Sequence, residues 1–121
     1  MHFNKKGYTV IKKAIDKKIA LFLYDYLLLK RKVAYHLFKE SYFSPFDTIL
    51  GQLSDTQVPE TYNHYADIMM ETLLMKLKPL MEKTVKYKLV PTYSYTRIYK
   101  KGDILHRHKD RPSCEISTTL N

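Results

Sequence analysis

Two histidines and one aspartate alternate with basic residues in the segment LHRHKDRPSC, residues 105–114. Imidazole nitrogens and carboxylate oxygens bind divalent metals at about 2 Å from the ion. In an extended strand, residues two apart point to the same side and are separated by about 6.6 Å, because each residue advances about 3.3 Å. His108 and Asp110 can therefore reach a common ion, whereas His106 and Asp110 lie too far apart unless the strand bends. The spacing favours His108 and Asp110 as a pair of metal ligands.

The alternative is an ordinary solvated strand edge. A His-x-Asp triplet is short enough to occur by chance, so it is a weak signal without its structural context. Arg107, Lys109 and Arg111 fall on the opposite face of the expected strand, where charged side chains are normally solvated. The surrounding elements have to decide between the two interpretations.

A meander of short strands is expected around the triplet. Residues 92–99 alternate large and small side chains, residues 100–103 form a turn at Gly102, and residues 104–110 continue as a second strand. Residues 114–120 form a third alternating segment. One face of the first strand carries Tyr93, Tyr95, Arg97 and Tyr99. Its arginine can reach an anion or stack on a neighbouring tyrosine.

The chain before this meander favours helices. A short strand is expected at residues 8–11, followed by a helix from an N-cap at Asp16 to about residue 38. Residues 39–61 read as a loop, and a second helix is expected over residues 62–83, kinked or restarted near Pro79. Helices followed by a strand meander predict an α+β protein. The apolar stripe of the first helix comprises Ile19, Phe22 or Leu23, Tyr26, Leu29 and Val33.

The composition fits a single domain spanning residues 1–121. The net charge of +9 comes from basic residues spread along the chain, Lys30 among them, which is typical of a solvated surface. The single cysteine, Cys114, excludes an internal disulfide framework, and the N-terminal residues lack the apolar stretch of a signal peptide. No apolar run approaches the ~20 residues of a membrane span. We therefore expect a soluble, intracellular (cytoplasmic) protein without a membrane partner.

The C-terminal quarter of the chain resembles the iron(II)- and 2-oxoglutarate-dependent dioxygenases, specifically the prolyl-4-hydroxylase-like group. In that group a Tyr-bearing strand is followed by a Gly turn, a His-x-Asp strand and an apolar strand. The matching features here are Tyr99, Gly102, His108-Lys109-Asp110 and residues 116–120, within a match that covers about residues 91–121. The resemblance implies a jelly roll (double-stranded β-helix) whose first strands lie in residues 91–121, with residues 1–90 as a helical support region.

The resemblance also implies roles for individual residues. His108 and Asp110 would be two arms of the 2-His-1-carboxylate triad that holds iron(II). Tyr99 and Thr119 match positions that contact 2-oxoglutarate. The second metal histidine of the family, and the basic residue for the far carboxylate of 2-oxoglutarate, come from strands that would follow Asn121. The expectation is therefore an incomplete barrel, inactive by itself, that associates through its exposed strand edge.

The implied activity is that of a hydroxylase that uses ascorbate as reductant and acts on a protein side chain or a small molecule. The rival interpretation is a basic module that binds single-stranded nucleic acid, with the tyrosine and arginine face stacking on bases. The net charge of +9 supports this rival. Against it, that face leads directly into the His-x-Asp triplet, and the carboxylate of Asp110 would repel phosphate. Nucleic acid is accordingly not the partner that we expect.

Overall fold

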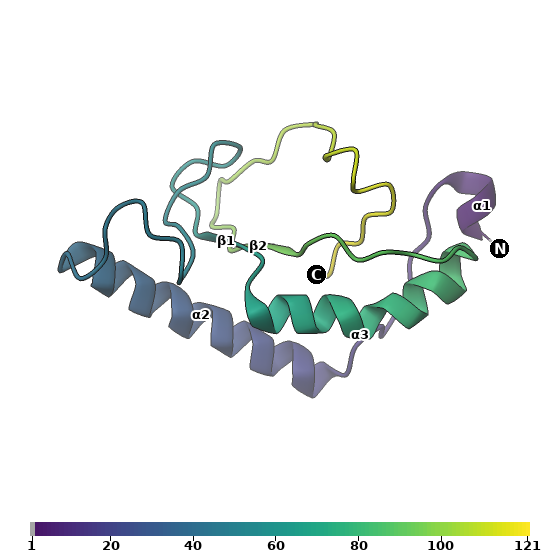
Figure 1. Cartoon of the computed structure of the whole chain (residues 1–121), viewed down its shortest axis with the longest axis horizontal. Coiled ribbons are helices and arrows are strands. Elements are labelled where there is room, and N and C mark those ends of the chain that lie inside the picture. The colour runs from purple at the N-terminus through teal and green to yellow at the C-terminus, as the bar shows by residue number, and fades with distance from the viewer. Residues whose placement is uncertain (1) are drawn as a thin grey trace.

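The structure, a computed structural model, describes residues 2–121 and combines helices with a small sheet (Figure 1). The α+β class expected from the sequence is thereby confirmed, and the sheet of the described residues is open and two-stranded. The elements in chain order are α1 (His2–Lys6), α2 (Lys17–Lys39), β1 (Asn63–Tyr65), α3 (Ile68–Val85) and β2 (Tyr95–Arg97).

The long helix α2 begins where the sequence predicts. The side chain of Asp16 accepts a hydrogen bond from the Lys18 amide at 2.7 Å, which satisfies one of the free N–H groups of the first turn. The predicted inward stripe is confirmed at Leu23, which is buried, and at Tyr26, which is half-buried. It is wrong at Ile19, Leu29 and Val33, which are exposed, and it missed the buried residues Lys30 and Ala34. The helix is apolar on several sides, so periodicity alone does not decide which side packs inward.

Helix α3 starts later than expected. Its N-cap is Asp67, whose side chain accepts a hydrogen bond from the Met70 amide at 3.2 Å. The preceding residues form β1 instead of the first helical turns, since Ala66 has a φ of +56° that separates the strand from the helix. The helix continues through Pro79, and Figure 1 shows its axis bending toward the C-terminal end.

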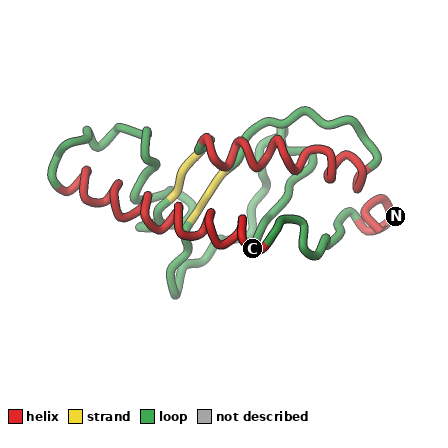
Figure 2. Tube along the Cα trace, turned by 90° about the horizontal axis from the view of Figure 1, so that it is seen from below, coloured by secondary structure: helices red, strands yellow, loops and turns green. Residues whose placement is uncertain are grey.

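The two strands pair antiparallel, with Asn63 opposite Arg97 and Tyr65 opposite Tyr95. Figure 2 shows them beside the start of α3. The loop of residues 39–61 returns to this sheet, because Gln52 pairs with Asn63 in an isolated bridge. Gly51 makes the approach possible, since a Cβ there would lie 2.5 Å from the Asn63 carbonyl oxygen and its φ is +87°.

Three other predicted strands are absent from the described residues. Residues 8–11 have no strand partner, and Tyr8 and Val10 are 63% and 78% exposed. Residues 104–110 and 114–120 run as loop, the yellow-green arch of Figure 1. Alternating side chains favour a strand only where a neighbouring backbone supplies a hydrogen-bonded ladder, and within residues 2–121 no such neighbour lies beside these segments.

Candidate functional site

His108 and Asp110 lie together in the arch that follows β2. The Nε2 atom of His108 is 3.3 Å from Oδ1 of Asp110, and the two side chains are 34% and 49% exposed. A turn, in which the Cys114 amide donates to the Arg111 carbonyl at 2.8 Å, folds the chain back beside them. Their closeness therefore arises in a loop, and not on one face of a strand as the sequence analysis expected.

A second set of contacts orients both side chains. Nδ1 of His108 lies 2.9 Å from the His106 carbonyl oxygen, which can only accept, so Nδ1 donates this hydrogen bond and Nε2 is the ring nitrogen that faces Asp110. The hydroxyl of Ser117 donates to Oδ2 of Asp110 at 2.9 Å, which leaves Oδ1 to face the imidazole. Backbone and hydroxyl partners of this kind hold the ligands of metal sites in place.

The donor pair fits part of an iron(II) site. An imidazole nitrogen and a carboxylate oxygen are the donor types of the 2-His-1-carboxylate triad. Within residues 2–121, however, no group of three His, Cys, Asp or Glu side chains is arranged to hold a metal ion. The contact of His106 with His108 involves the backbone carbonyl of His106, and among the described residues its side chain is not bonded to His108 or Asp110. The described residues therefore bring two possible ligands together, without a third beside them.

Tyr99 and Thr119 are the residues predicted to contact 2-oxoglutarate. Tyr99 is 48% exposed, and its hydroxyl accepts a hydrogen bond from Nη1 of Arg97 at 3.0 Å. Thr119 is exposed near the end of the arch. The described contacts do not join either residue to His108 or Asp110, so their roles remain predictions.

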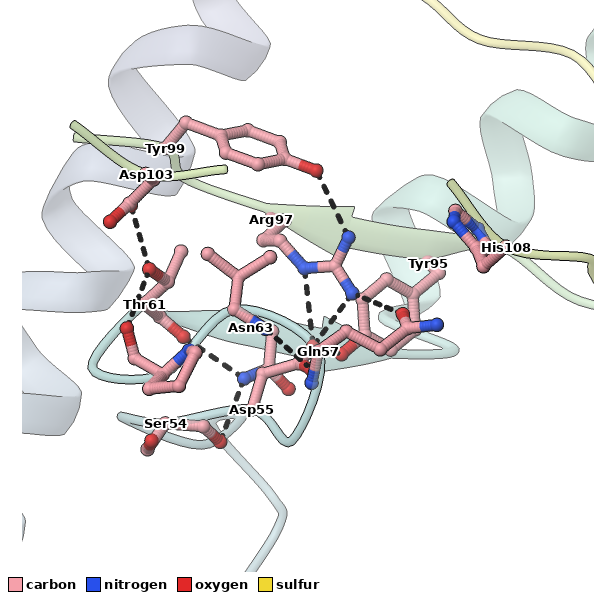
Figure 3. A network of polar contacts seen from close by, with 12 residues as sticks. Ser54, Asp55, Gln57, Thr61, Asn63, Tyr95, Arg97, Tyr99, Asp103 and His108 are labelled. Atoms are coloured by element: carbon pink, nitrogen blue, oxygen red, sulfur yellow. Dashed lines mark hydrogen bonds and ion pairs between the residues drawn. The ribbon is translucent and has the colours of Figure 1, made fainter. Parts of the chain in front are cut away.

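Arg97 is the centre of a polar network that sequence reasoning found only in part (Figure 3). Its guanidinium donates to Oδ2 of Asp55 from Nε at 3.1 Å and from Nη2 at 2.8 Å. It also lies over the rings of Tyr95 and Tyr99, 4.9 Å and 5.7 Å from their centroids. Both options expected for this arginine, an anion and a stack, are therefore realised by residues of the chain itself.

Asp55 brings the loop of residues 39–61 to β2. Burial by itself would raise the pKa of its carboxyl, but hydrogen bonds from Tyr95 and Arg97 outweigh that effect and lower the pKa to about 2. The pKa of Tyr95 rises to about 12 because of burial and of its bond to Asp55. Since four of the five N–H donors of Arg97 are occupied and its charge is paired with Asp55, this arginine is poorly available to a phosphate, which weighs against the nucleic-acid interpretation.

A buried cluster of charged groups joins α2 to the start of α3. Lys30 donates hydrogen bonds to both Asp67 and Nδ1 of His64, and the Tyr26 hydroxyl donates to Asp67 at 2.5 Å. The side chains of Lys30 and Asp67 are each only 5% exposed. The prediction of a solvated Lys30 is thus wrong, because its partners lie 34 and 37 residues away and only folding brings them together.

The cluster also sets the protonation of His64. Burial, with the nearby charge of Lys30, lowers the pKa of the imidazole. Because an ammonium group can only donate, Nδ1 of His64 accepts and the ring is neutral. One feature of the sequence indicates that Lys30 is buried: it lies on the same face of the helix as the apolar residues Leu23 and Ala34.

Comparison with protein-family models, with curated proteins and with solved structures gives no match for this chain. Among residues 2–121, no helix has both the length and the apolar character needed to cross a membrane.

Proposed function

We propose that the chain is part of an iron(II)- and 2-oxoglutarate-dependent oxygenase of the prolyl-4-hydroxylase-like kind, with His108 and Asp110 as two of its three metal ligands. One observation carries the proposal. His108 uses Nδ1, and Asp110 uses Oδ2, for a bond to the surrounding chain, while Nε2 and Oδ1 converge at 3.3 Å. A solvated strand edge would not require both side chains to be oriented in this way.

The residues would divide the work as follows. Iron(II) would supply the reaction of dioxygen with 2-oxoglutarate, in which one oxygen atom enters succinate as the oxo acid loses carbon dioxide and the other hydroxylates a C–H bond; ascorbate would serve only to keep the iron in the iron(II) state. His108 and Asp110 would hold the ion through Nε2 and Oδ1. The third protein ligand comes from outside the described residues, in a jelly roll that residues 91–121 begin. The 121-residue chain is accordingly expected to bind iron weakly and to lack turnover.

Tyr99 has the geometry of a carboxylate donor. Its oxygen already accepts a hydrogen bond from Arg97, so its own proton is free to be donated to 2-oxoglutarate. The Arg97 guanidinium lies 5.7 Å from the centroid of the Tyr99 ring, so its positive charge would help to attract the carboxylate that accepts this hydrogen bond. Thr119 is proposed as a second, weaker contact to the same co-substrate.

The test is anaerobic addition of iron(II) and 2-oxoglutarate to the chain, followed in the visible spectrum. An oxo acid chelated to iron(II) gives a charge-transfer band, which should appear with the protein above a protein-free blank. The band should be lost in His108→Ala and in Asp110→Ala, and retained in the matched control His106→Ala. Absence of the band, or a band that survives all three changes, contradicts the proposal. Binding of single-stranded nucleic acid in its place would favour the rival function.

A further inference from the structure

A second arginine, Arg111, lies on a pair of tyrosine rings. Tyr65, the last residue of β1, and Tyr93, just before β2, place their ring centroids 5.1 Å apart. The Arg111 guanidinium lies 5.9 Å from the Tyr65 centroid and 5.4 Å from the Tyr93 centroid. Both distances lie within the range of a cation–π contact, so the two rings together position the Arg111 cation.

The two stacked arginines of the chain differ in one respect. Arg97 lies on Tyr95 and Tyr99, and its edge is occupied by the Asp55 carboxylate. Arg111 is exposed, and no hydrogen bond or ion pair joins its guanidinium to any of residues 2–121. A tyrosine-stacked arginine in this protein thus has a partner carboxylate in one case and an open edge in the other.

We propose that Arg111, positioned by Tyr65 and Tyr93, binds a carboxylate of an external ligand. A guanidinium carries several N–H donors in one plane and can bind the two coplanar oxygens of a carboxylate; at Arg97, Nε and Nη2 both donate to a single carboxylate oxygen, Oδ2 of Asp55. Arg111 follows Asp110 directly, so the bound carboxylate would lie beside the proposed metal pair. The carboxylate belongs either to the substrate or to 2-oxoglutarate. This placement rests on the proposed function, whereas carboxylate binding itself does not.

The experiment measures binding to the metal-free chain. The Arg111 Nε–H signal is followed by ¹⁵N NMR during titration with N-acetylglycine, with 2-oxoglutarate and with inorganic phosphate, at constant ionic strength. Saturable shifts with both carboxylates are expected in the millimolar range, and affinity should fall by about tenfold or more in Arg111→Met, because a charge-assisted paired hydrogen bond is lost. Arg107→Met removes the same charge four residues away and should bind as the parent does.

Two further comparisons complete the test. Tyr65→Ala keeps every charge but removes half of the platform, so weaker carboxylate binding by this variant supports a positioned site. If N-acetylglycine and 2-oxoglutarate have similar titration midpoints, the site belongs to the substrate. If the midpoint for 2-oxoglutarate is about tenfold lower, the site belongs to the co-substrate. Shifts that do not saturate, that persist in Arg111→Met, or that only phosphate produces overturn the proposal. A missing charge-transfer band alongside saturable carboxylate binding would refute the metal pair alone.

Discussion

Replacing Lys30 with methionine should destabilise the fold severely, because it leaves a buried carboxylate without its counter-charge. Lys30 and Asp67 are both 5% exposed, and Lys30 also donates to His64. Methionine keeps much of the length and apolar volume of the lysine stem, so the change removes charge and donors with little loss of packing. Removal of one partner of a buried ion pair costs about 3–5 kcal/mol.

The structure places the expected value near the lower end of that range. Asp67 keeps hydrogen bonds from the Tyr26 hydroxyl at 2.5 Å and from the Met70 amide at 3.2 Å. These neutral donors continue to stabilise the carboxylate, so we expect a loss of about 3 kcal/mol. Since domains of this size have a total stability of about 5–15 kcal/mol, the loss is large enough to measure and can unfold the chain.

The assay is urea unfolding followed by far-ultraviolet circular dichroism. Lys32→Met, on the exposed side of the same helix, is the matched control and should change the free energy of unfolding by less than about 0.5 kcal/mol. The double variant Lys30→Met with Asp67→Asn removes the uncompensated charge and should recover about 1–2 kcal/mol over the single variant. Equal stability of Lys30→Met and Lys32→Met would refute the buried pair, and so would a double variant with no recovery.

Three further predictions concern pH and the loop. The pKa of Asp55 in the folded chain, about 2, lies below that of an unfolded aspartate. The stability that this carboxylate contributes is therefore present above about pH 4 and is lost as the pH falls toward 2. Asp55→Asn should remove this part of an acid-unfolding curve. The pKa of His64 is lowered in the folded chain, so the unfolded chain takes up a proton at a higher pH than the folded chain does. The free energy of unfolding should therefore decline as the pH falls below about 6.5. His64→Gln should reduce this decline, measured as the urea midpoint at a series of pH values. Gly51→Ala should cost about 1–3 kcal/mol of stability in thermal melting, because the new Cβ meets the Asn63 carbonyl and the backbone has a positive φ. Gly102→Ala is the control: its φ is also positive, but no atom lies within 4 Å of the Cβ, so it measures the cost of φ alone.

Features fixed by local chemistry could be predicted from the sequence. The start of α2 follows from Asp16, since an N-cap bond involves only residues two positions apart. Strand β2 lies inside the predicted residues 92–99, which begin with tyrosines alternating with threonine and serine. The Arg97 stack on its neighbours Tyr95 and Tyr99 was expected for the same reason, namely that residues two apart share a strand face.

Features that depend on distant partners could not be predicted. Strand β1 has only three residues and pairs with residues 30 to 34 positions later, and residues 8–11, predicted as a short strand, do not acquire a partner. The contact between Asp55 and Arg97 spans 42 residues, and the one between Lys30 and Asp67 spans 37. Such pairs have no periodic signature, because loop closure and packing select them. The orientation of His108 and Asp110 likewise depends on a carbonyl and on Ser117, whose roles appear only in the folded chain.

The most direct test of the central claim locates a bound ion on the chain. Manganese(II), a redox-inert substitute for iron(II), is added in substoichiometric amounts, and the broadening of histidine ring signals is recorded by NMR. The proposed pair predicts that His108 broadens first and most strongly, with the side chain of Asp110 affected at the same metal concentration, and that the chelator EDTA reverses the effect. Asp110→Asn should weaken the broadening at His108. Preferential broadening of His36 or His64, with His108 unchanged, would contradict the metal pair.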